Sequence, residues 1–337
     1  MKKHAISLDE IGYGACRSVD EFEKVKRLGE GTYGVVYEGI DKKSKERVAL
    51  KKIRVEKEID PLSLATFREI HTLMKAKHRN IVKLKEMAVG RSIGKIYLVM
   101  EFCQQDLGNL MDHMKLPFTE PQIKCLVLQL FEGLKYLHER FIIHRDLKVS
   151  NLLLTDEGIL KIADFGLTRG FGEPAMKMTP RVVTLWYRPP ELLFGDERQT
   201  PALDMWAAGC ILGELIKHEP LLPGKDEIHQ IRLIVNLLGT PNKTIWPDMK
   251  ELEFELKEQS FNRLRSVFPN LSEECLALLK RLLAYDPKRR ISAVECMNHE
   301  YFSKPPHACE PSLMPSLKSL TRSSRTRSST IDLDFEV

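Results

Sequence analysis

The sequence of 337 residues predicts an α+β fold with two lobes: a small antiparallel sheet with one helix, followed by a larger and mainly helical lobe. Strand-like segments separated by polar turns fill residues 22–52, and KIYLVMEF at 95–102 adds another strand. From Thr119 onward, apolar residues instead recur at the spacing of helices. This change of period divides the chain into two kinds of structure.

The first lobe is expected over about residues 22–102. Its predicted strands are FEKVKRL, VVYEGI and RVALKKI, which are separated by GEGTYG and DKKSKE. Pro61 then opens a segment in which Leu64, Phe67 and Leu73 recur near helical spacing. Together these elements make a sheet with one helix.

The second lobe is expected over about residues 103–302. A long helix is predicted after Thr119, because six apolar residues fall at helical spacing: Ile123, Leu126, Val127, Leu130, Leu134 and Leu137. Further helices are predicted at 204–217, 226–238, 272–283 and 292–297. No period of 20–50 residues recurs, which argues against a repeat protein.

Two flanking segments lie outside this domain. Residues 1–21 are interpreted as an N-terminal extension, and residues 303–337, rich in Pro, Ser and Thr, as a flexible tail. Within the tail, a basic run fits an anionic surface, a nuclear address or simply a solvated tail, and the last of these is the simplest. The run consists of Lys318, Arg322, Arg325 and Arg327.

Composition excludes several classes of protein. No apolar stretch is long enough to span a membrane and the start has no signal-like apolar core, so we expect a soluble intracellular protein in the nucleus and cytoplasm, without membrane association. Seven scattered cysteines without a CxxC pair argue against a disulfide framework or a zinc site. The near balance of 52 basic and 47 acidic side chains by itself says nothing about nucleic acid, and we expect no specific nucleic-acid partner.

A glycine-rich turn is the first motif with chemical meaning. Gly29, Gly31 and Gly34 form GxGxxG between two predicted strands, whereas a dinucleotide-binding loop leads from a strand into a helix. This context argues against a dehydrogenase. Glycines here would let backbone N–H groups approach a triphosphate, although a tight hairpin that needs glycine is an equally good interpretation of this motif alone.

Lys51 and Glu69 are a candidate ion pair. Strand alternation turns Lys51 away from the face that carries Val48 and Leu50, and Glu69 follows on the predicted helix. A lysine in this position can contact the α- and β-phosphates of a nucleotide while the glutamate orients it. The alternative is an ordinary solvated lysine.

HRDLKVSN followed by ADFG is the strongest signal in the sequence. Asn151 and Asp164 supply oxygen ligands of the kind that Mg²⁺ prefers, and Asp146 can accept or orient a hydroxyl proton. Lys148 lies where it could contact the γ-phosphate. Each motif alone could be turn-forming residues, but their combined order makes chance a poor explanation.

Residues 22–302 resemble the eukaryotic protein kinases, and within them the cyclin-dependent kinases. The marks are GEGTYGVVYE, VALKKI, FREI, VVTLWYR, DMWAAGCILGEL, PLLPG, LLGTP and YDPKRRISA. The resemblance implies the bilobal protein-kinase fold and transfer of the γ-phosphoryl of ATP, with Mg²⁺, to serine or threonine followed by proline. It also implies a function in cell-cycle or transcription-linked regulation.

The resemblance assigns residues to the nucleotide. Met100 would be the gatekeeper, Glu101 and Cys103 the hinge that binds adenine, and Asp106 a ribose contact. Val36 and Leu153 would enclose the adenine. The remaining implied nucleotide contacts are Leu28, Gly29, Glu30, Gly31, Thr32, Tyr33, Gly34, Val35, Ala49 and Lys51.

The resemblance also implies regulation by phosphorylation. Thr179 stands where an upstream activating kinase would add a phosphate, and Arg68, Arg145 and Arg169 match the arginines that bind it. An unmodified loop threonine is the alternative. Phosphate on Thr32 or Tyr33 would repel ATP, so these two residues are candidate inhibitory sites.

Partner and substrate contacts follow in the same way. The helix around FREI matches the cyclin-binding helix of the family, with Phe67 and Ile70 facing the partner; cyclin M is the cyclin that the resemblance suggests, and packing in the lobe's own core is the alternative. Val182, Val183 and Arg188 resemble the pocket that selects proline. Asp204 would hold the catalytic loop from behind, and Glu191 would pair with Arg290.

Three alternatives stay open at this point. A pseudokinase would keep the fold without turnover, although Lys51, Asp146, Asn151 and Asp164 are all present. A mitogen-activated type of kinase is disfavoured because 164–191 has no TxY motif. A nucleic-acid-binding protein would depend on the basic tail alone.

Overall fold

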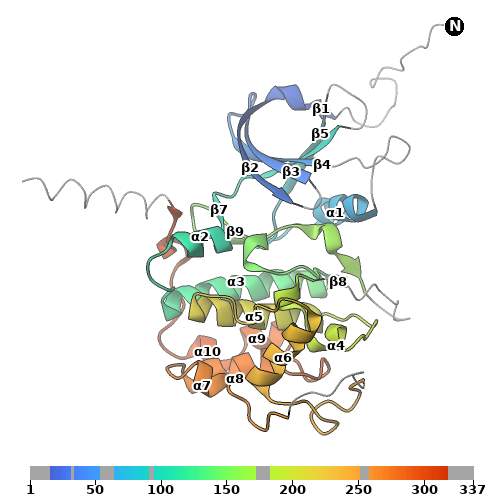
Figure 1. The fold of residues 1–337 in the computed structure, drawn as a ribbon. Helices are drawn as coiled ribbons and strands as arrows, with labels where there is room; N and C mark the ends of the chain where they lie inside the picture. The colour runs from blue at the N-terminus through green and yellow to red at the C-terminus, as the bar shows by residue number, and fades with distance from the viewer. Residues whose placement is uncertain are drawn as a thin grey trace, which may run out of the picture. The chain divides into compact units, whose positions relative to one another are not determined.

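The computed structural model describes residues 16–31, 34–53, 64–90, 95–171, 183–250 and 258–317 (Figure 1). Contacts divide the chain into two compact units, one of Met1–Lys77 with Val82–Phe102 and the other of His78–Ile81 with Cys103–Val337. Within the described ranges, no helix combines the length and apolar character that crossing a membrane requires.

The first unit is a six-stranded sheet with one helix. Its strands run in the order β1-β5-β6-β4-β3-β2, and all neighbours are antiparallel except β1 and β5. The elements are β1 (Arg17–Ser18), the 3₁₀ helix η2 (Val19–Glu21), β2 (Phe22–Gly31), β3 (Gly34–Asp41), β4 (Arg47–Ile53), α1 (Leu64–Lys75), β5 (Leu84–Val89) and β6 (Ile96–Glu101). The predicted sheet and helix are therefore confirmed.

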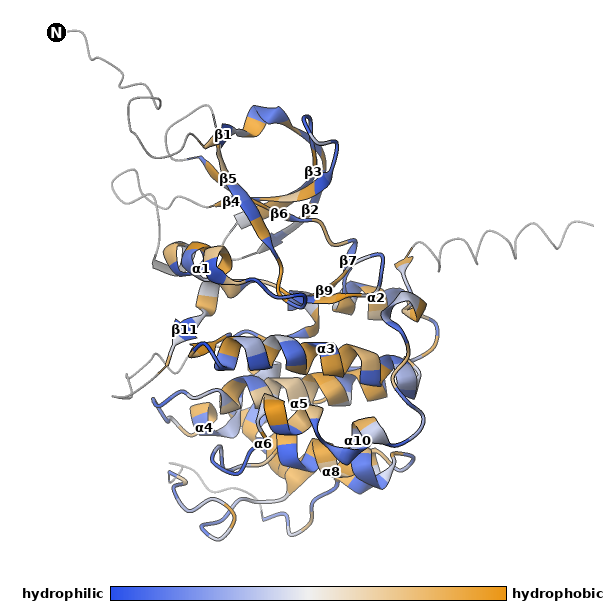
Figure 2. Cartoon of the chain, turned by 180° about the vertical axis from the view of Figure 1, so that it is seen from behind, coloured by the Kyte–Doolittle hydropathy of each residue, from blue (hydrophilic) through white to orange (hydrophobic). Residues whose placement is uncertain are grey.

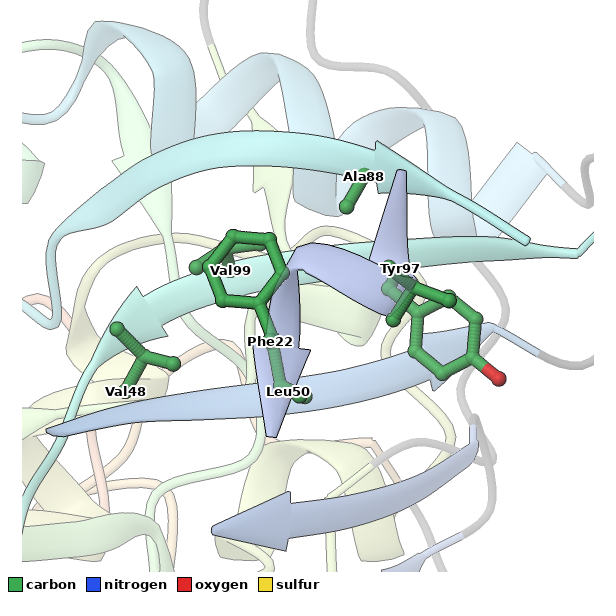
Figure 3. Packing of buried hydrophobic residues seen from close by; sticks show 7 residues of the cluster. Phe22, Val48, Leu50, Ala88, Tyr97 and Val99 are labelled. Carbon is green, nitrogen blue, oxygen red and sulfur yellow. The ribbon is translucent and has the colours of Figure 1, made fainter. Parts of the chain in front are cut away.

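A compact apolar cluster forms on one face of this sheet (Figure 3). Val48 and Leu50 of β4 both contribute to it, as strand alternation requires for residues two apart. The other larger side chains of the cluster belong to Phe22, Tyr97 and Val99. Ala49 and Lys51 consequently belong to the opposite face of β4.

The sheet begins earlier than the sequence indicated. Residues 17–21 were expected to lie in an extension, but β1 pairs with β5 and Val19 is buried in the cluster. The guanidinium of Arg17 bridges three carboxylates, those of Glu21, Asp41 and Glu86. This ionic network fixes a segment that carries few apolar residues of its own.

The second unit is mainly helical. Its α-helices are α2 (Leu107–His113), α3 (Glu120–His138), α4 (Pro190–Leu193), α5 (Ala202–Lys217), α6 (Glu227–Leu238), α7 (Leu264–Val267), α8 (Glu273–Leu282), α9 (Ala293–Met297) and α10 (Glu300–Ser303). The 3₁₀ turns are η3 (Val149–Asn151), η4 (Phe165–Leu167), η5 (Leu185–Tyr187) and η6 (Pro311–Leu313). The helices predicted after Thr119 are confirmed within a few residues at each end, whereas α2 was not predicted.

Two long helices build the core of this unit. α3 begins with a capping box, in which Thr119 and Gln122 bond each other's backbone, and its apolar stripe is buried. α5 packs against α3 and α8 and is buried around most of its circumference, with Trp206 fully enclosed. The polar and apolar residues of α3 can be seen in Figure 2, where this helix carries both blue and orange segments.

Short strands fix the loops beside these helices. One small sheet has the order β10-β9-β7, formed by β7 (Gln105–Asp106), β9 (Leu152–Leu154) and β10 (Leu160–Ile162). A second pairs β8 (Ile142–Ile143) with β11 (Arg169–Gly170). The chain between β8 and β9, and that between β10 and β11, is therefore anchored at both ends.

The tail expected to be flexible from residue 303 is fixed as far as Leu317. The ammonium of Lys124 donates to the carbonyl of Lys304, and the N–H of Cys309 donates to the carbonyl of Pro121. A Cβ on Gly158, which has φ +72°, would collide with the carbonyl of Pro311. Backbone hydrogen bonds and close packing thus order a segment whose composition resembles a linker.

Candidate active site

The loop between β8 and β9 carries the HRDLKVSN motif and is held by α5. The carboxylate of Asp204 accepts the backbone N–H groups of His144 and Arg145, both at 2.9 Å. Although burial opposes it, hydrogen bonding and charge from His138 hold the pKa of Asp204 below its usual range. The predicted contact of Asp204 with this loop is present.

The carboxylate of Asp146 accepts hydrogen bonds at both of its oxygens. Its Oδ2 accepts from Lys148 Nζ at 2.9 Å and from Asn151 Nδ2 at 3.1 Å. Its Oδ1 accepts from the hydroxyl of Thr184 at 2.9 Å and more weakly from that residue's N–H at 3.3 Å. The side chain is 10% exposed, so these donors fix its orientation while its edge still reaches the surface.

Asn151 and Asp164 are brought together by the backbone. The N–H of Ala163 donates to the carbonyl of Asn151 at 2.9 Å, and the carbonyl of Ala163 bonds the ring of His144 at 3.0 Å. Asp164 follows with a left-handed backbone, φ 64°. A left-handed backbone is uncommon for a residue with a side chain, and aspartate is one of the few residue types that tolerate it.

These two residues fit a magnesium ion. The amide nitrogen of Asn151 donates to the carbonyl and carboxylate of Asp146, which leaves its oxygen as the ligand atom. Among the described residues, no group of three or more His, Cys, Asp or Glu side chains could hold a metal. A mixed set of one carboxylate and one amide oxygen suits Mg²⁺, which takes its other ligands from phosphate and water.

Lys51 and Glu69 form a buried ion pair in the first unit. Lys51 Nζ lies 2.6 Å from Glu69 Oε1, and the two side chains are 10% and 3% exposed. β4 supplies the lysine and α1 the glutamate. The predicted pair is therefore present, and burial makes it sensitive to the loss of either charge.

The predicted nucleotide residues of the first unit share one face of the sheet. Val36 of β3 is the register partner of Lys51, and Ala49 is the partner of Met100 on β6. Cross-strand partners point to the same face, which is the one opposite the apolar cluster. Gly29 pairs with Val36, and nothing lies within 4 Å of a Cβ placed on it.

The other predicted nucleotide residues divide between the two units. Leu28, Glu30, Gly31, Gly34, Val35 and Glu101 belong to the first, and Thr32 and Tyr33 lie outside the described residues. A Cβ on Gly34 would collide with the carbonyl of Lys52, so this glycine also satisfies a packing requirement. Cys103, Asp106 and Leu153 belong to the second unit, where Asp106 caps α2 by accepting the N–H of Asn109.

Comparison with known proteins agrees with this geometry. Residues 22–302 match the family model described as "Protein kinase domain". Human cyclin-dependent kinase 10 is 56% identical over 306 residues, which cover 90% of this chain and 85% of that protein. The chain belongs to the cyclin-dependent kinases. It is a serine/threonine protein kinase, and the family resemblance noted in the sequence is confirmed.

Other relatives of this kinase are more distant. Human cyclin-dependent kinase 11B is 47% identical over 320 residues, or 94% of this chain and 40% of that protein. Cyclin-dependent kinase G-2 of Oryza sativa subsp. japonica is 47% identical over 321 residues, or 92% of this chain and 45% of that protein. Membership of this family implies the use of ATP with a divalent metal ion.

The predicted proline pocket of the kinase is partly described. Val183 has a left-handed backbone with φ 69° and is buried. Its carbonyl accepts a 3.1 Å bond from the guanidinium of Arg188, which also pairs with Glu227 at 2.6 Å. Such a backbone is strained for a β-branched residue, and Arg188 helps to hold it. Val182 lies outside the described residues.

The three predicted phosphate-binding arginines lie on different elements. Arg169 of β11 pairs with Ile143 of β8, which places it near Arg145 in the second unit. Arg68 lies on α1 in the first unit, and Thr179 is outside the described residues. Arg290 binds both carboxylate oxygens of Glu191, at 2.7 and 2.8 Å, as the sequence predicted.

The prediction for α1 needs a correction. Phe67 is 58% exposed, but Ile70 is only 7% exposed and belongs to the core. Two residues that are three positions apart point in different directions around the helix. At the edge of the apolar stripe, one of them can therefore be exposed while the other is buried. The exposed apolar residue that follows Phe67 on this helix is Met74, which is 65% exposed.

Thr184 was missed as a site residue. Its hydroxyl lies between Lys148 Nζ and Asp146 Oδ1, at 3.2 and 2.9 Å. The only sequence signal was its place in the VVTLWYR run. Nothing in local patterning relates it to a loop 38 residues earlier.

Proposed function

We propose that this kinase transfers the γ-phosphoryl group of ATP to serine or threonine followed by proline, with Asp146 as the catalytic base. The observation that carries this proposal is the set of donors around Asp146. Lys148, Asn151 and Thr184 engage both carboxylate oxygens. A carboxylate oriented in this way can accept or align the proton of an incoming hydroxyl.

The remaining chemistry is positioning and charge. Asn151 and Asp164 would hold Mg²⁺, which when bound neutralises the phosphate oxygens. Lys51, held by Glu69, would contact the α- and β-phosphates, and Lys148 the γ-phosphate. The backbone around Gly29 and Gly31 would cover the phosphates.

Adenine recognition is proposed for the hinge residues that the sequence predicted. Glu101 and Cys103 would bind it through backbone groups beside the gatekeeper Met100. Val36, Ala49 and Leu153 would supply apolar contact, and Asp106 a ribose contact. In support, Val36, Ala49 and Met100 share one sheet face with Lys51.

Proline selection is proposed for the segment that contains Val183. Its carbonyl already accepts a hydrogen bond from Arg188, which disfavours a second one from the N–H of the substrate residue after the phosphoacceptor. Any residue with a backbone N–H would leave that donor unsatisfied, whereas proline has none. Val182 would contribute to the same pocket.

Activation is proposed to require a cyclin and a phosphate. The exposed apolar residues of α1 would contact a cyclin, with cyclin M as the candidate. An upstream kinase would modify Thr179, whose phosphate Arg68, Arg145 and Arg169 would bind. Phosphate on Thr32 or Tyr33 would inhibit. We propose a regulatory function in the cell cycle or transcription, in the nucleus and cytoplasm.

The test is a phosphorylation assay of the full chain with cyclin M. A Ser-Pro peptide should be labelled from ATP and Mg²⁺, whereas the matched Ser-Ala peptide should not, and chelation of Mg²⁺ should stop the reaction. Thr179→Ala should lower activity sharply, with Met178→Ala as the matched control. Equal labelling of both peptides would refute proline selection, and full activity of Thr179→Ala would refute activation at that residue.

A further inference from the structure

A groove of about 610 Å³ lies beside the catalytic loop, wholly within the second unit. One wall is α2, which contributes Met111 and Asp112, and another is the loop after Asp146. The end of α5 and the chain after it complete the groove with Glu214 and Glu219. None of these three carboxylates was assigned to the phosphoryl-transfer site.

The groove carries an excess of negative charge. Its lining includes three carboxylates, Asp112, Glu214 and Glu219, and a single lysine or arginine, Lys148, which already pairs with Asp146. Lys217 pairs with Glu219 at 2.7 Å, so the excess charge rests on Asp112 and Glu214. Asp112 is exposed and has no ion pair in the described part of the chain. Burial raises the pKa of Glu214 and the charge of Asp112 adds to this, although the hydroxyl of Tyr187 donates to Glu214 at 2.7 Å and opposes the shift. A guanidinium in the groove would relieve this unfavourable charge.

The C-terminal segment of the chain is directed to the start of α2. Gln105, the residue before the cap of that helix, is 6% exposed and binds the segment twice. Its amide nitrogen donates to the carbonyl of Pro315 at 3.3 Å, and its oxygen accepts the N–H of Leu317 at 2.8 Å. The chain is therefore fixed in place immediately before its basic run.

The basic run lies within reach of the groove. Arg322, Arg325 and Arg327 follow Leu317 by five, eight and ten residues. An extended chain covers about 3.3 Å per residue, so these arginines reach about 16 to 33 Å from Leu317. α2, with its seven residues, is only about 10 Å long. The arginines can thus pass the whole helix and arrive at Asp112.

We propose that the groove binds the chain's own basic segment, residues 318–329. Arg322, Arg325 and Arg327 face Asp112, Glu214 and Glu219, and the apolar floor at Met111 and Trp186 receives the stems of the arginines. Because the segment is tethered at Gln105, its effective concentration is high and weak ion pairs suffice.

The proposal has a consequence for substrates, and this part rests on the proposed function. Lys148 and Thr184 line the same groove, so a bound tail competes with a protein substrate for the space beside Asp146. Seven hydroxyl residues accompany the arginines in this segment: Ser319, Thr321, Ser323, Ser324, Thr326, Ser328 and Ser329. Phosphate on them would cancel the positive charge and release the segment.

The test uses the full chain with Arg322, Arg325 and Arg327 all changed to Glu. Hydrogen exchange of residues 107–114 and 214–220 should become faster, while residues 293–303 should not change. In the cyclin complex, the KM for a Ser-Pro peptide should fall about three- to tenfold with kcat unchanged. Ser323, Ser324 and Ser328 changed together to Ala provide the control, because the charges remain.

A charge swap between Asp112 and Arg325 tests whether these two residues contact each other. Asp112→Arg alone should speed exchange of 107–114, and combination with Arg325→Asp should restore slow exchange. Glu300→Arg, an exposed control on α10, should have no effect. Unchanged exchange in the tail variant would overturn the proposal. If exchange is unchanged and Asp112→Arg alters only the KM for the peptide, the groove binds substrate and not the tail. Exchange needs no turnover, so it separates this proposal from failure of the proposed function.

Discussion

The hydroxyl of Thr184 donates a 2.9 Å hydrogen bond to Oδ1 of Asp146. Asp146 therefore has a partner on the segment that leads into η5, in addition to those on its own loop. The segment before η5 also contains Val183, whose carbonyl Arg188 holds. Orientation of the proposed base is thus linked to the proposed proline pocket by two adjacent residues.

Thr184→Val should lower kcat about tenfold and reduce the unfolding free energy by no more than about 1–3 kcal/mol. Valine keeps the shape of threonine but removes the hydroxyl, and a lost bond to a charged group corresponds to about 1.5 kcal/mol or more. Steady-state kinetics with a Ser-Pro peptide measure this. Thr184→Ser should retain activity; if it is as impaired as the valine variant, the hydroxyl is not the relevant group.

Glu69→Gln should both destabilise the kinase and reduce its activity, because it removes the negative charge that Glu69 places 2.6 Å from the buried ammonium of Lys51. The loss of one partner of such a pair costs about 3–5 kcal/mol of unfolding free energy. The double variant Lys51→Met with Glu69→Leu should recover stability in urea unfolding yet stay inactive. An active double variant would exclude Lys51 from phosphate binding.

Phe67→Ala and Ile70→Ala should have opposite consequences. Phe67 is exposed, so its loss should weaken cyclin binding and leave the unfolding free energy nearly unchanged. Ile70 is buried, so its loss should cost about 3 kcal/mol of stability. Titration calorimetry and urea unfolding separate the two effects. A Phe67→Ala variant with unchanged cyclin affinity would remove α1 from the proposed interface.

Asp41 should stabilise the first unit at neutral pH and lose that effect in acid. Its hydrogen bond to Arg17 holds the pKa of the Asp41 carboxyl well below its usual range. A depressed pKa contributes stability above the unfolded pKa of about 3.9, and this stability disappears as the pH falls through that value toward the folded pKa. Asp41→Asn should therefore lower the urea midpoint at pH 7 and by a smaller amount at pH 3. An equal loss at both values would contradict this assignment.

The sequence predicted the parts of this kinase that local pattern and motif determine. The α3 stripe, the HRDLKVSN loop and the Lys51–Glu69 pair all appear as expected, because periodicity and motif spacing constrain them directly. Arg17 and Gln105 gave no such signal. Arg17 bridges carboxylates up to 69 residues away, and Gln105 binds a segment more than 200 residues later. Contacts between such distant residues depend on the assembled fold.

Two differences have a simple physical origin. Residues 304–317 are rich in proline and poor in periodic apolar side chains, so composition predicted a flexible tail, but hydrogen bonds to the backbone of Pro121 and to the side chain of Gln105 order them. Ile70 was expected beside Phe67 on an exposed surface. From a single sequence, one cannot tell which of two apolar residues three positions apart on a helix is buried and which is exposed.

The most direct test of the account is the rate at which the cyclin-bound kinase transfers phosphate from ATP to a Ser-Pro peptide, measured for the native chain and for Asp146→Asn. The account predicts a loss of about 10²- to 10⁴-fold in kcat, with ATP affinity and the urea midpoint nearly unchanged. An Asp146→Asn variant that turns over at the native rate would contradict it.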